Sequence, residues 1–532
     1  MELYHDTSTD TLLYETTEQA RILTHLSESR AVNGHMVGVP VNLRNLQILR
    51  KLDLPVIPII RDSNYDWPHA PDITPLPHQK LMANFCVLNP YCCNLSDMGT
   101  MKTLSTLWAL DWLMRQHPEG EFRALIVAPL SILERTWSEA IAANFLDRRT
   151  YKIVHGSEKA RRRLLAEEAD FYIINFDGLA VGARTRGRFV LEGFARDLHQ
   201  RTDIRAVVID EAGAYRDSRT RRHRVARVIC KRDYLWALTG TPCPNGPPDA
   251  YGISKLVNDA FGESYTAFHN RTMVKVSQFR WIPKKDGYLQ ARRLLTPSIR
   301  FDIKDVWNGP PLTVQRRDVA LTANQKHMLE ELRSRLVIEL EHGGLIDPVN
   351  EAAARTKFLQ IVCGAVYDQD HEAHLTDARH RLDELLQVIT NANGKILIFA
   401  PFTSVVHLIY KELKKHRITV AEVTGAVSKT DRTKIFADFQ NAEDPRALVA
   451  DPGCVSHGLD LWQAQTVIWY APIDKNEQYT QGNARAHRPG QKYPVTIVQL
   501  TSTALEREIF TRLQMRQSQQ GVMLAAVKRG LN

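Results

Sequence analysis

The sequence lacks the features that mark membrane and secreted proteins. None of its apolar runs approaches the roughly 20 residues that a membrane-spanning helix requires. The amino terminus (MELYHDTSTDTLLYETTEQ) is acidic and polar, whereas a secretory signal begins basic and continues apolar. We therefore expect a cytoplasmic protein with no membrane partner.

Cysteine is scarce, and no tract is repetitive. The cysteines at 86, 92, 93, 230, 243, 363 and 454 have neither the spacing of zinc ligands nor that of a disulfide framework. We expect them to be small apolar core residues. Neither an internal repeat nor a low-complexity segment is visible in the sequence, which argues against a repeat architecture.

What is present is the composition of an ordinary globular protein with excess positive charge. The 532 residues, 44% hydrophobic and 24% charged, are enough for two large domains or about three smaller ones. The net charge of +9 indicates a polyanionic partner. Basic residues crowd into two expected helices, at 159–163 (KARRR) and within 216–232. Phosphate binding and a solvated helix face are both open interpretations of these two runs.

Two regions alternate short apolar runs with longer amphipathic stretches, which is typical of a parallel α/β sheet. The strands expected in the first region are 91–95, 124–127, 171–175, 206–209 and 235–239, with helices over 103–115, 131–144 and 158–168. Those expected in the second region are 395–399, 419–423, 447–450, 466–470 and 495–500. We therefore predict an α/β fold with an accessory segment over 1–72, a first lobe over 73–305 and a second lobe over 306–532.

The segment NLSDMGTMKT, residues 94–103, follows an expected strand and opens an expected helix. A phosphate-binding loop needs this position, because backbone N–H groups and the helix dipole then point at an anion. Lys102 would neutralise the β and γ phosphates of ATP, and the Thr103 hydroxyl would bind Mg²⁺. The other nucleotide-binding residues of the loop would be Met98, Gly99, Thr100 and Met101. The alternative is an ordinary loop that happens to end in Lys-Thr.

A second motif, AVVIDEA at 206–212, is an apolar strand with Asp210 and Glu211 at its carboxyl end. Asp210 would bind the metal, and Glu211 would be the base that orients the attacking water. A strand that ends in a solvated acidic turn is the alternative.

The order of these motifs resembles helicase superfamily 2, specifically its Swi/Snf-like translocases of double-stranded DNA and most closely the compact phage-type members. The resemblance runs from about residue 76 to the end of the chain and implies two RecA-like lobes that hold ATP between them. Gln79, in LPHQK, would read the adenine. The segment 127–133 followed by Trp137 would contact DNA, and LTGTP at 238–242 would link hydrolysis to movement.

The resemblance continues in the second lobe with KILIFAPF at 395–402 and SHGLDL at 456–461, where Gly458 and Asp460 would contact the nucleotide. The most specific match is QGNARAHRPGQ, residues 481–491. On a helix, Gln481, Arg485 and Arg488 fall at i, i+4 and i+7, so one face could present both guanidiniums to the γ phosphate. A solvated, arginine-rich helix is the alternative.

Three positions depart from the family pattern. Met101 replaces the last glycine of the phosphate loop, and backbone strain of about 1–2 kcal/mol there would weaken ATP binding about tenfold. Gly213 stands where the family usually has histidine, so the relay from hydrolysis to motion is expected to differ. The run DPGCV at 451–455 replaces the usual small residues.

The resemblance therefore implies a DNA-stimulated ATPase that moves along duplex DNA with little sequence preference, in the host cytoplasm if the protein is viral. A strand-separating DNA or RNA helicase shares every ATP motif and would need a wedge that the sequence does not reveal. A degenerate ATPase that only clamps nucleic acid is the other alternative, motivated by Met101 and Gly213. Retention of the lysine, both carboxylates and both arginines favours the motor.

Overall fold

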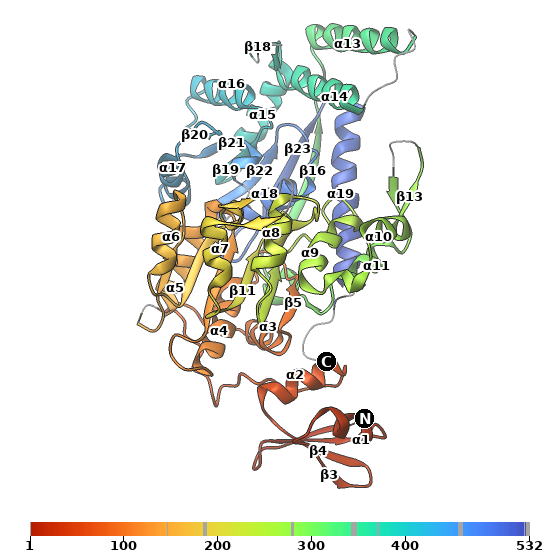
Figure 1. The fold of residues 1–532 in the computed structure, drawn as a ribbon. Helices are drawn as coiled ribbons and strands as arrows, with labels where there is room; N and C mark the ends of the chain where they lie inside the picture. Colours follow the sequence, from red (N-terminus) through yellow and green to blue (C-terminus); the bar gives the residue numbers. More distant parts are fainter. Residues whose placement is uncertain are drawn as a thin grey trace. The chain divides into compact units, whose positions relative to one another are not determined.

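The computed structural model divides the chain into two compact units. Unit 1 comprises Met1–Val274, Pro283–Val306 and Gly521–Asn532, and unit 2 comprises Lys275–Ile282 and Trp307–Gln520. The structure describes residues 2–145, 147–184, 189–277, 281–341, 348–368, 370, 372–455, 461–525 and 527. Figure 1 labels the helices and strands along the chain.

The first residues of unit 1 form a four-stranded antiparallel sheet. Its order is β1 (Glu2–Asp6), β2 (Thr11–Glu15), β4 (Met36–Pro40) and β3 (Arg30–Asn33), accompanied by α1 (Gln19–His25) and α2 (Leu43–Lys51). Leu12, Tyr14 and Val37 of this sheet are fully buried in the same hydrophobic cluster as Met82 and Leu107. The accessory segment therefore shares a core with the residues that follow it.

A seven-stranded parallel sheet lies at the centre of unit 1. Its order is β15 (Ser298–Ile299), β5 (Tyr91–Asn94), β12 (Tyr234–Leu238), β11 (Ile204–Asp210), β6 (Arg123–Ala128), β8 (Phe171–Asn175) and β7 (Tyr151–Ile153). Consecutive residues such as Val207 and Val208 belong to different hydrophobic clusters, because successive side chains of a strand face opposite sides. Both faces of the sheet are buried, and the five strands predicted for this region are confirmed.

The helices of unit 1 follow the predicted order with one difference. They include α3 (Pro77–Leu88), α4 (Lys102–Arg115), α6 (Glu158–Ala166), α7 (Gly193–Gln200), α8 (Arg221–Ile229), α9 (Ala250–Val257), α10 (Tyr265–Thr272), α11 (Gly287–Leu294) and α12 (Ile303–Val306). The single helix predicted over 131–144 is instead a 3₁₀ turn (Leu130–Ile132), a π turn (Leu133–Ser138) and α5 (Glu139–Phe145). π turns are rare and concentrate at functional sites, and this one carries Trp137.

Unit 2 contains a six-stranded parallel sheet. Its order is β16 (Leu312–Asp318), β23 (Val495–Thr501), β22 (Ala464–Trp469), β19 (Lys395–Phe399), β21 (Ala447–Ala450) and β20 (Val420–Val423). The five strands predicted for this region are confirmed, and β16 is an additional edge strand. The two parallel sheets confirm the α/β fold class of two tandem lobes.

Helices and one short hairpin complete unit 2. They are α13 (Ala323–Glu341), α14 (Pro348–Cys363), β17 (Ala365–Tyr367), β18 (Ala373–Leu375), α15 (Arg379–Asn391), α16 (Thr403–Lys415), α17 (Lys429–Asn441), α18 (Asn476–Ala486) and α19 (Ala504–Ala525), of which the residues from Gly521 onward belong to unit 1. A buried ion pair joins α15 to the start of α19, with 2.6 Å between Arg381 Nη2 and Glu506 Oε1. Arg381 Nη1 also donates to the carbonyl oxygen of Tyr470 at 2.7 Å, which fixes both helices against the end of β22.

All cysteines except the half-buried Cys454 are buried, which agrees with their expected place in the core. Across the described part of the chain, no helix is both long enough and apolar enough to cross a membrane.

Candidate active site

The loop between β5 and α4 has the backbone of a tight strand-to-helix turn. Gly99 has a φ of +84°, and Met101 has φ +59° and ψ +39°, so both residues are left-handed. Met101 immediately precedes Lys102, the first residue of α4. A non-glycine residue pays about 1–2 kcal/mol in this region, so Met101 does occupy a glycine-favouring position.

Lys102 reaches back over its own loop. Its Nζ donates hydrogen bonds to the carbonyl oxygens of Ser96, at 2.7 Å, and Asp97, at 2.8 Å. Burial lowers the pKa of Lys102, while the negative charges of Glu211 and Asp210 act in the opposite direction. The structure therefore brings the lysine of the loop and the acidic residues Asp210 and Glu211 within electrostatic reach of one another.

Asp210 and Glu211 stand at the carboxyl end of β11 in different backbone conformations. Asp210 ends the strand, and Glu211 is left-handed with a φ of +49°. The indole nitrogen of Trp137 donates to Asp210 Oδ2 at 2.9 Å, and the Glu211 amide donates to Asp210 Oδ1 at 3.0 Å. Burial raises the pKa of Asp210, and the Trp137 hydrogen bond and the Lys102 charge oppose that shift. The carboxylate is thus oriented by two donors while it stays next to a cation.

Trp137 differs from its expected role. The resemblance placed it in a DNA-contact segment, but its side chain is fully buried and its indole N–H is bound to Asp210. The side chain therefore orients the acidic pair from within unit 1 and is not exposed to a nucleic acid. The sequence around Trp137 carries no signal for this contact, since the two partners are 73 residues apart.

An Asp97–Arg300 ion pair, which no sequence motif indicated, stabilises the loop between β5 and α4. Arg300 Nη1 lies 2.9 Å from Asp97 Oδ1 and also donates to the Leu95 carbonyl oxygen at 2.9 Å. The amide of Ile303 donates to Asp97 Oδ2 at 3.1 Å. Burial raises the pKa of Asp97, and the Arg300 charge opposes this. The loop is therefore fastened to the segment that leads into α12.

Gln79 and His78 approach the loop from α3. Gln79 is fully buried, its Oε1 accepts from the Leu76 amide at 2.8 Å, and its Nε2 lies 3.4 Å from the sulfur of Met101. His78 Nε2 lies 3.2 Å from the carbonyl oxygen of Thr100. Gln79 thus contacts the residue that departs from the family pattern, and its role in adenine recognition stays a prediction.

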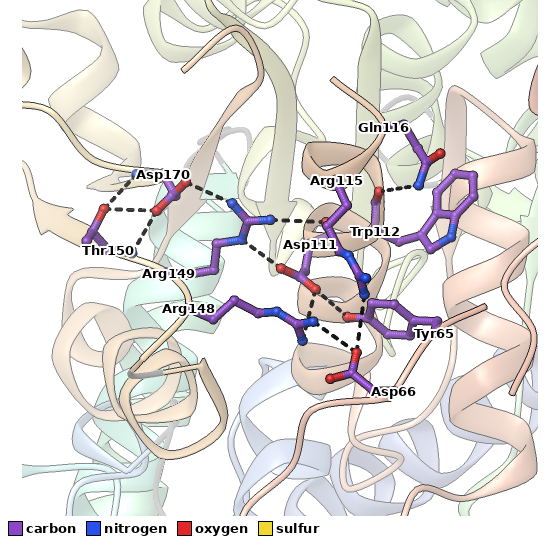
Figure 2. Close-up of polar contacts among 10 residues, drawn as sticks. All are labelled: Tyr65, Asp66, Asp111, Trp112, Arg115, Gln116, Arg148, Arg149, Thr150 and Asp170. Carbon is purple, nitrogen blue, oxygen red and sulfur yellow. Dashed lines mark hydrogen bonds and ion pairs between the residues drawn. The ribbon is translucent and has the colours of Figure 1, made fainter. Parts of the chain in front are cut away.

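The C-terminal half of α4 is anchored by a buried polar network (Figure 2). Asp111 is inaccessible to solvent, and its carboxylate accepts from Tyr65 Oη at 2.8 Å and Arg149 Nε at 2.6 Å. Arg149 Nη1 also donates to Asp170 Oδ1 at 3.1 Å, and Arg148 Nη2 donates to Asp66 Oδ1 at 3.0 Å. The helix that begins at the phosphate loop is therefore tied to the accessory segment and to the residues before β7.

In unit 2, α18 carries only part of the predicted arginine face. Gln481 and Arg485 lie on the helix and are buried, but α18 ends at Ala486 and Arg488 lies beyond it. The prediction that Arg488 continues the helical spacing at i+7 is wrong, because Pro489 disfavours a helical conformation in the residue before it. Both polar atoms of the Gln481 amide are buried without a hydrogen-bond partner among the described residues.

The remaining predicted residues form two groups. Thr103 lies on the first turn of α4, and its role as a ligand of Mg²⁺ stays a prediction. Gly458 and Asp460 lie outside the described residues. Across the described residues, no group of three or more histidine, cysteine or acidic side chains could hold a metal by itself.

In both basic runs, 159–163 and 216–232, some arginines make contacts within the protein. Arg161 of α6 is 5% exposed and donates to the Val154 carbonyl oxygen at 2.7 Å. Arg222 of α8 forms an ion pair with Asp177 at 2.6 Å, and Arg221 donates to the Ala183 carbonyl oxygen at 2.6 Å. These contacts support the structural interpretation for individual arginines of each run.

Comparisons with known proteins agree with the motif order. A model of the SNF2-related domain matches residues 88–363, and a model of the helicase conserved C-terminal domain matches residues 378–490. Protein p41 of Acyrthosiphon pisum secondary endosymbiont phage 1 is 26% identical over 480 residues, which are 86% of this chain and 99% of p41.

Other relatives are much longer or more distant. Chromodomain-helicase-DNA-binding protein 6 of Rattus norvegicus is 22% identical over 487 residues, which are 81% of this chain but 17% of that protein. A solved structure, the Sulfolobus solfataricus SWI2/SNF2 ATPase core in complex with dsDNA, is 21% identical with a TM-score of 0.40, and the match covers 86% of this chain and 95% of that one. This chain thus spans nearly all of the phage protein and only a small part of the chromodomain protein.

Proposed function

Because this chain belongs to the SNF2-related family of nucleic-acid-dependent ATPases, we propose that it couples ATP hydrolysis to movement along double-stranded DNA. The observation that carries the proposal is the proximity of Lys102 to Asp210 and Glu211, whose charges act on the lysine across the end of the sheet. A cation beside two carboxylates at a helix N-terminus is the arrangement that nucleoside triphosphate hydrolysis requires.

We assign a role to each candidate active-site residue of unit 1. The backbone N–H groups of the loop and the Lys102 ammonium bind and neutralise phosphate oxygens. The Thr103 hydroxyl and the Asp210 carboxylate hold Mg²⁺, and Trp137 keeps that carboxylate oriented. Glu211 positions the attacking water and accepts its proton. Bound Mg²⁺-ATP supplies the phosphoryl group and the divalent charge that stabilises its transfer.

We propose that Gln481, Arg485 and Arg488 of unit 2 act on the γ phosphate, and that Gln79, Gly458 and Asp460 contact the nucleotide. Arginine stabilises the charge that develops on a transferred phosphoryl group and is worth about a thousandfold or more in rate. Arg485→Lys and Arg488→Lys should therefore each lower kcat strongly, because lysine keeps the charge but loses the planar fork.

The proposed track is double-stranded DNA in the cytoplasm. The net charge of +9 and the words DNA-binding in the name of the chromodomain relative support a DNA partner. Contacts to phosphates are indifferent to sequence and weaken with salt, so we expect DNA affinity to fall steeply between low and moderate ionic strength. An affinity that does not change with salt would contradict phosphate binding.

The test is steady-state phosphate release without nucleic acid and with duplex DNA, single-stranded DNA or RNA. Stimulation by duplex DNA, abolished by Lys102→Ala and by Glu211→Gln, would support the motor. Lys152→Ala is the matched control, since Lys152 lies on the edge strand β7 in an ion pair with Glu167 at 2.5 Å. Release that duplex DNA does not stimulate would refute the proposal.

The left-handed conformation of Met101 motivates one alternative function. In this alternative the protein is a clamp that binds nucleic acid in an ATP-dependent way without hydrolysis. Tight ATP-dependent DNA binding with no phosphate release would favour this clamp. A labelled fork substrate separates a translocase from a strand-separating helicase, because only the latter releases the displaced strand.

A further inference from the structure

A short two-stranded hairpin connects α10 to α11. It consists of β13 (Met273–Lys275) and β14 (Trp281–Pro283), and its base is closed by a hydrogen bond from the Lys284 amide to the Thr272 carbonyl oxygen at 2.9 Å. Val274 is 43% exposed and Val276 is 57% exposed, and Lys275 between them is also exposed. Met273 is half-buried, but since successive strand residues face opposite sides, both faces of this strand carry exposed side chains.

The second strand exposes larger apolar side chains. Trp281 is 37% exposed and Ile282 is 40% exposed. An isolated two-stranded hairpin is at best marginally stable in water, and exposed apolar side chains add little to its stability. Clustered exposed apolar residues instead mark a surface that binds a partner.

Charge identifies the chemistry of that partner. Between residues 273 and 285 the sequence has no acidic residue, and its basic residues are Lys275, Arg280, Lys284 and Lys285. The β17–β18 hairpin provides a contrast within the same chain. It exposes Leu375 at 64%, but residues 365–377 contain no lysine or arginine, and their acidic residues are Asp368, Asp370, Glu372 and Asp377. Of these two hairpins, which both expose apolar residues, the β13–β14 hairpin is the one whose charge suits a polyanion.

We propose that the β13–β14 hairpin binds unpaired bases next to a DNA duplex, with Trp281 stacked on a base and Lys275 and Lys285 on phosphates. Aromatic side chains bind single strands of any sequence in this way, because every base has a π face, while neighbouring cations follow the backbone. The inference builds on the proposed function and goes beyond it: the enzyme distinguishes a junction between duplex and single strand from uninterrupted duplex.

The test compares binding of a blunt duplex with binding of the same duplex carrying a single-stranded extension, without nucleotide. The wild-type protein should bind the extended DNA more tightly. Trp281→Ala should weaken that binding about tenfold and leave blunt-duplex binding and duplex-stimulated ATPase unchanged, whereas Trp281→Phe should keep the preference. Lys275→Gln with Lys285→Gln should reduce the salt slope for the extension by roughly 0.7 per lysine.

Leu375→Ala in the acidic hairpin is the matched control and should leave the junction preference unchanged. Equal binding of both DNAs by the wild-type protein, or an intact preference in Trp281→Ala, would overturn the inference. It would also be overturned if Trp281→Ala abolished concentration-dependent self-association and left DNA binding intact, because the hairpin would then be a protein interface. Failure of duplex DNA to stimulate the ATPase would refute the motor instead, since the junction assay needs no hydrolysis.

Discussion

Replacement of Met101 by glycine tests whether the phosphate loop carries backbone strain. Met101 has a φ of +59°, where a side chain costs about 1–2 kcal/mol relative to glycine. Glycine also gives the unfolded chain more freedom, which offsets about 0.4–1 kcal/mol. Met101→Ala removes the same side chain but keeps the strain. We therefore expect Met101→Gly to be more stable than Met101→Ala by about 0.5–1 kcal/mol.

Met98 is a matched control in the same loop, since its φ is not positive. There the order should reverse, with Met98→Gly less stable than Met98→Ala by about 0.4–1 kcal/mol. Urea unfolding of the four variants, followed by tryptophan fluorescence, measures both differences. If Met101→Gly is no more stable than Met101→Ala, the strain argument is refuted.

Nucleotide affinity decides where the strain acts. If the backbone strain is the same with and without bound nucleotide, Met101→Gly and Met101→Ala will bind ATP equally. If the strain opposes nucleotide binding, Met101→Gly will bind up to about tenfold more tightly than Met101→Ala. Equilibrium titration with a fluorescent ATP analogue distinguishes these outcomes.

Three further substitutions test the electrostatics of the fold. Asp210→Asn should abolish hydrolysis but stabilise the protein at neutral pH. Burial raises the pKa of Asp210 in the folded protein above the ordinary value of 3.8. The wild type therefore loses stability as the pH rises from 3.8 through the raised pKa, whereas asparagine does not titrate. Unfolding at about pH 4 and about pH 8 checks this, and a gain that shrinks at the higher pH contradicts it. Glu506→Gln leaves the charge of Arg381 buried and unpaired, so unfolding should require about 3–5 kcal/mol less free energy in a urea titration. Asp111→Asn weakens the anchor to Arg149 and should cost about 2 kcal/mol in the same assay.

The sequence predicted most of the two parallel sheets and the two motifs of unit 1. Strands such as β8 and β19 were predicted to the residue, because a strand buried on both faces is a continuous apolar run bounded by polar residues. The Lys102 loop and the Asp210–Glu211 pair were found for a related reason. Each depends on a local transition at a strand's carboxyl end, and parallel strands bring those ends to one edge of the sheet.

The amino-terminal sheet was not predicted, because its edge strands carry weak patterns. Every residue of β3 is exposed, and β1 is at most half-buried. The predicted arginine face of α18 extended too far along the chain. Helical periodicity assumes that the helix continues, whereas α18 ends at Ala486. In both cases a local pattern was too weak or too short to determine the structure.

The chain's own order of apolar runs, turns and charged residues thus determined its fold class, its family and most of its proposed catalytic residues. Tertiary structure alone decided which side chains support them. Arg300 braces the phosphate loop through Asp97, and Trp137 orients Asp210, although each pair is far apart in the sequence. The physical reason is that such partners are chosen by close packing in three dimensions, where a buried polar group must find a donor or acceptor from whichever segment packs beside it.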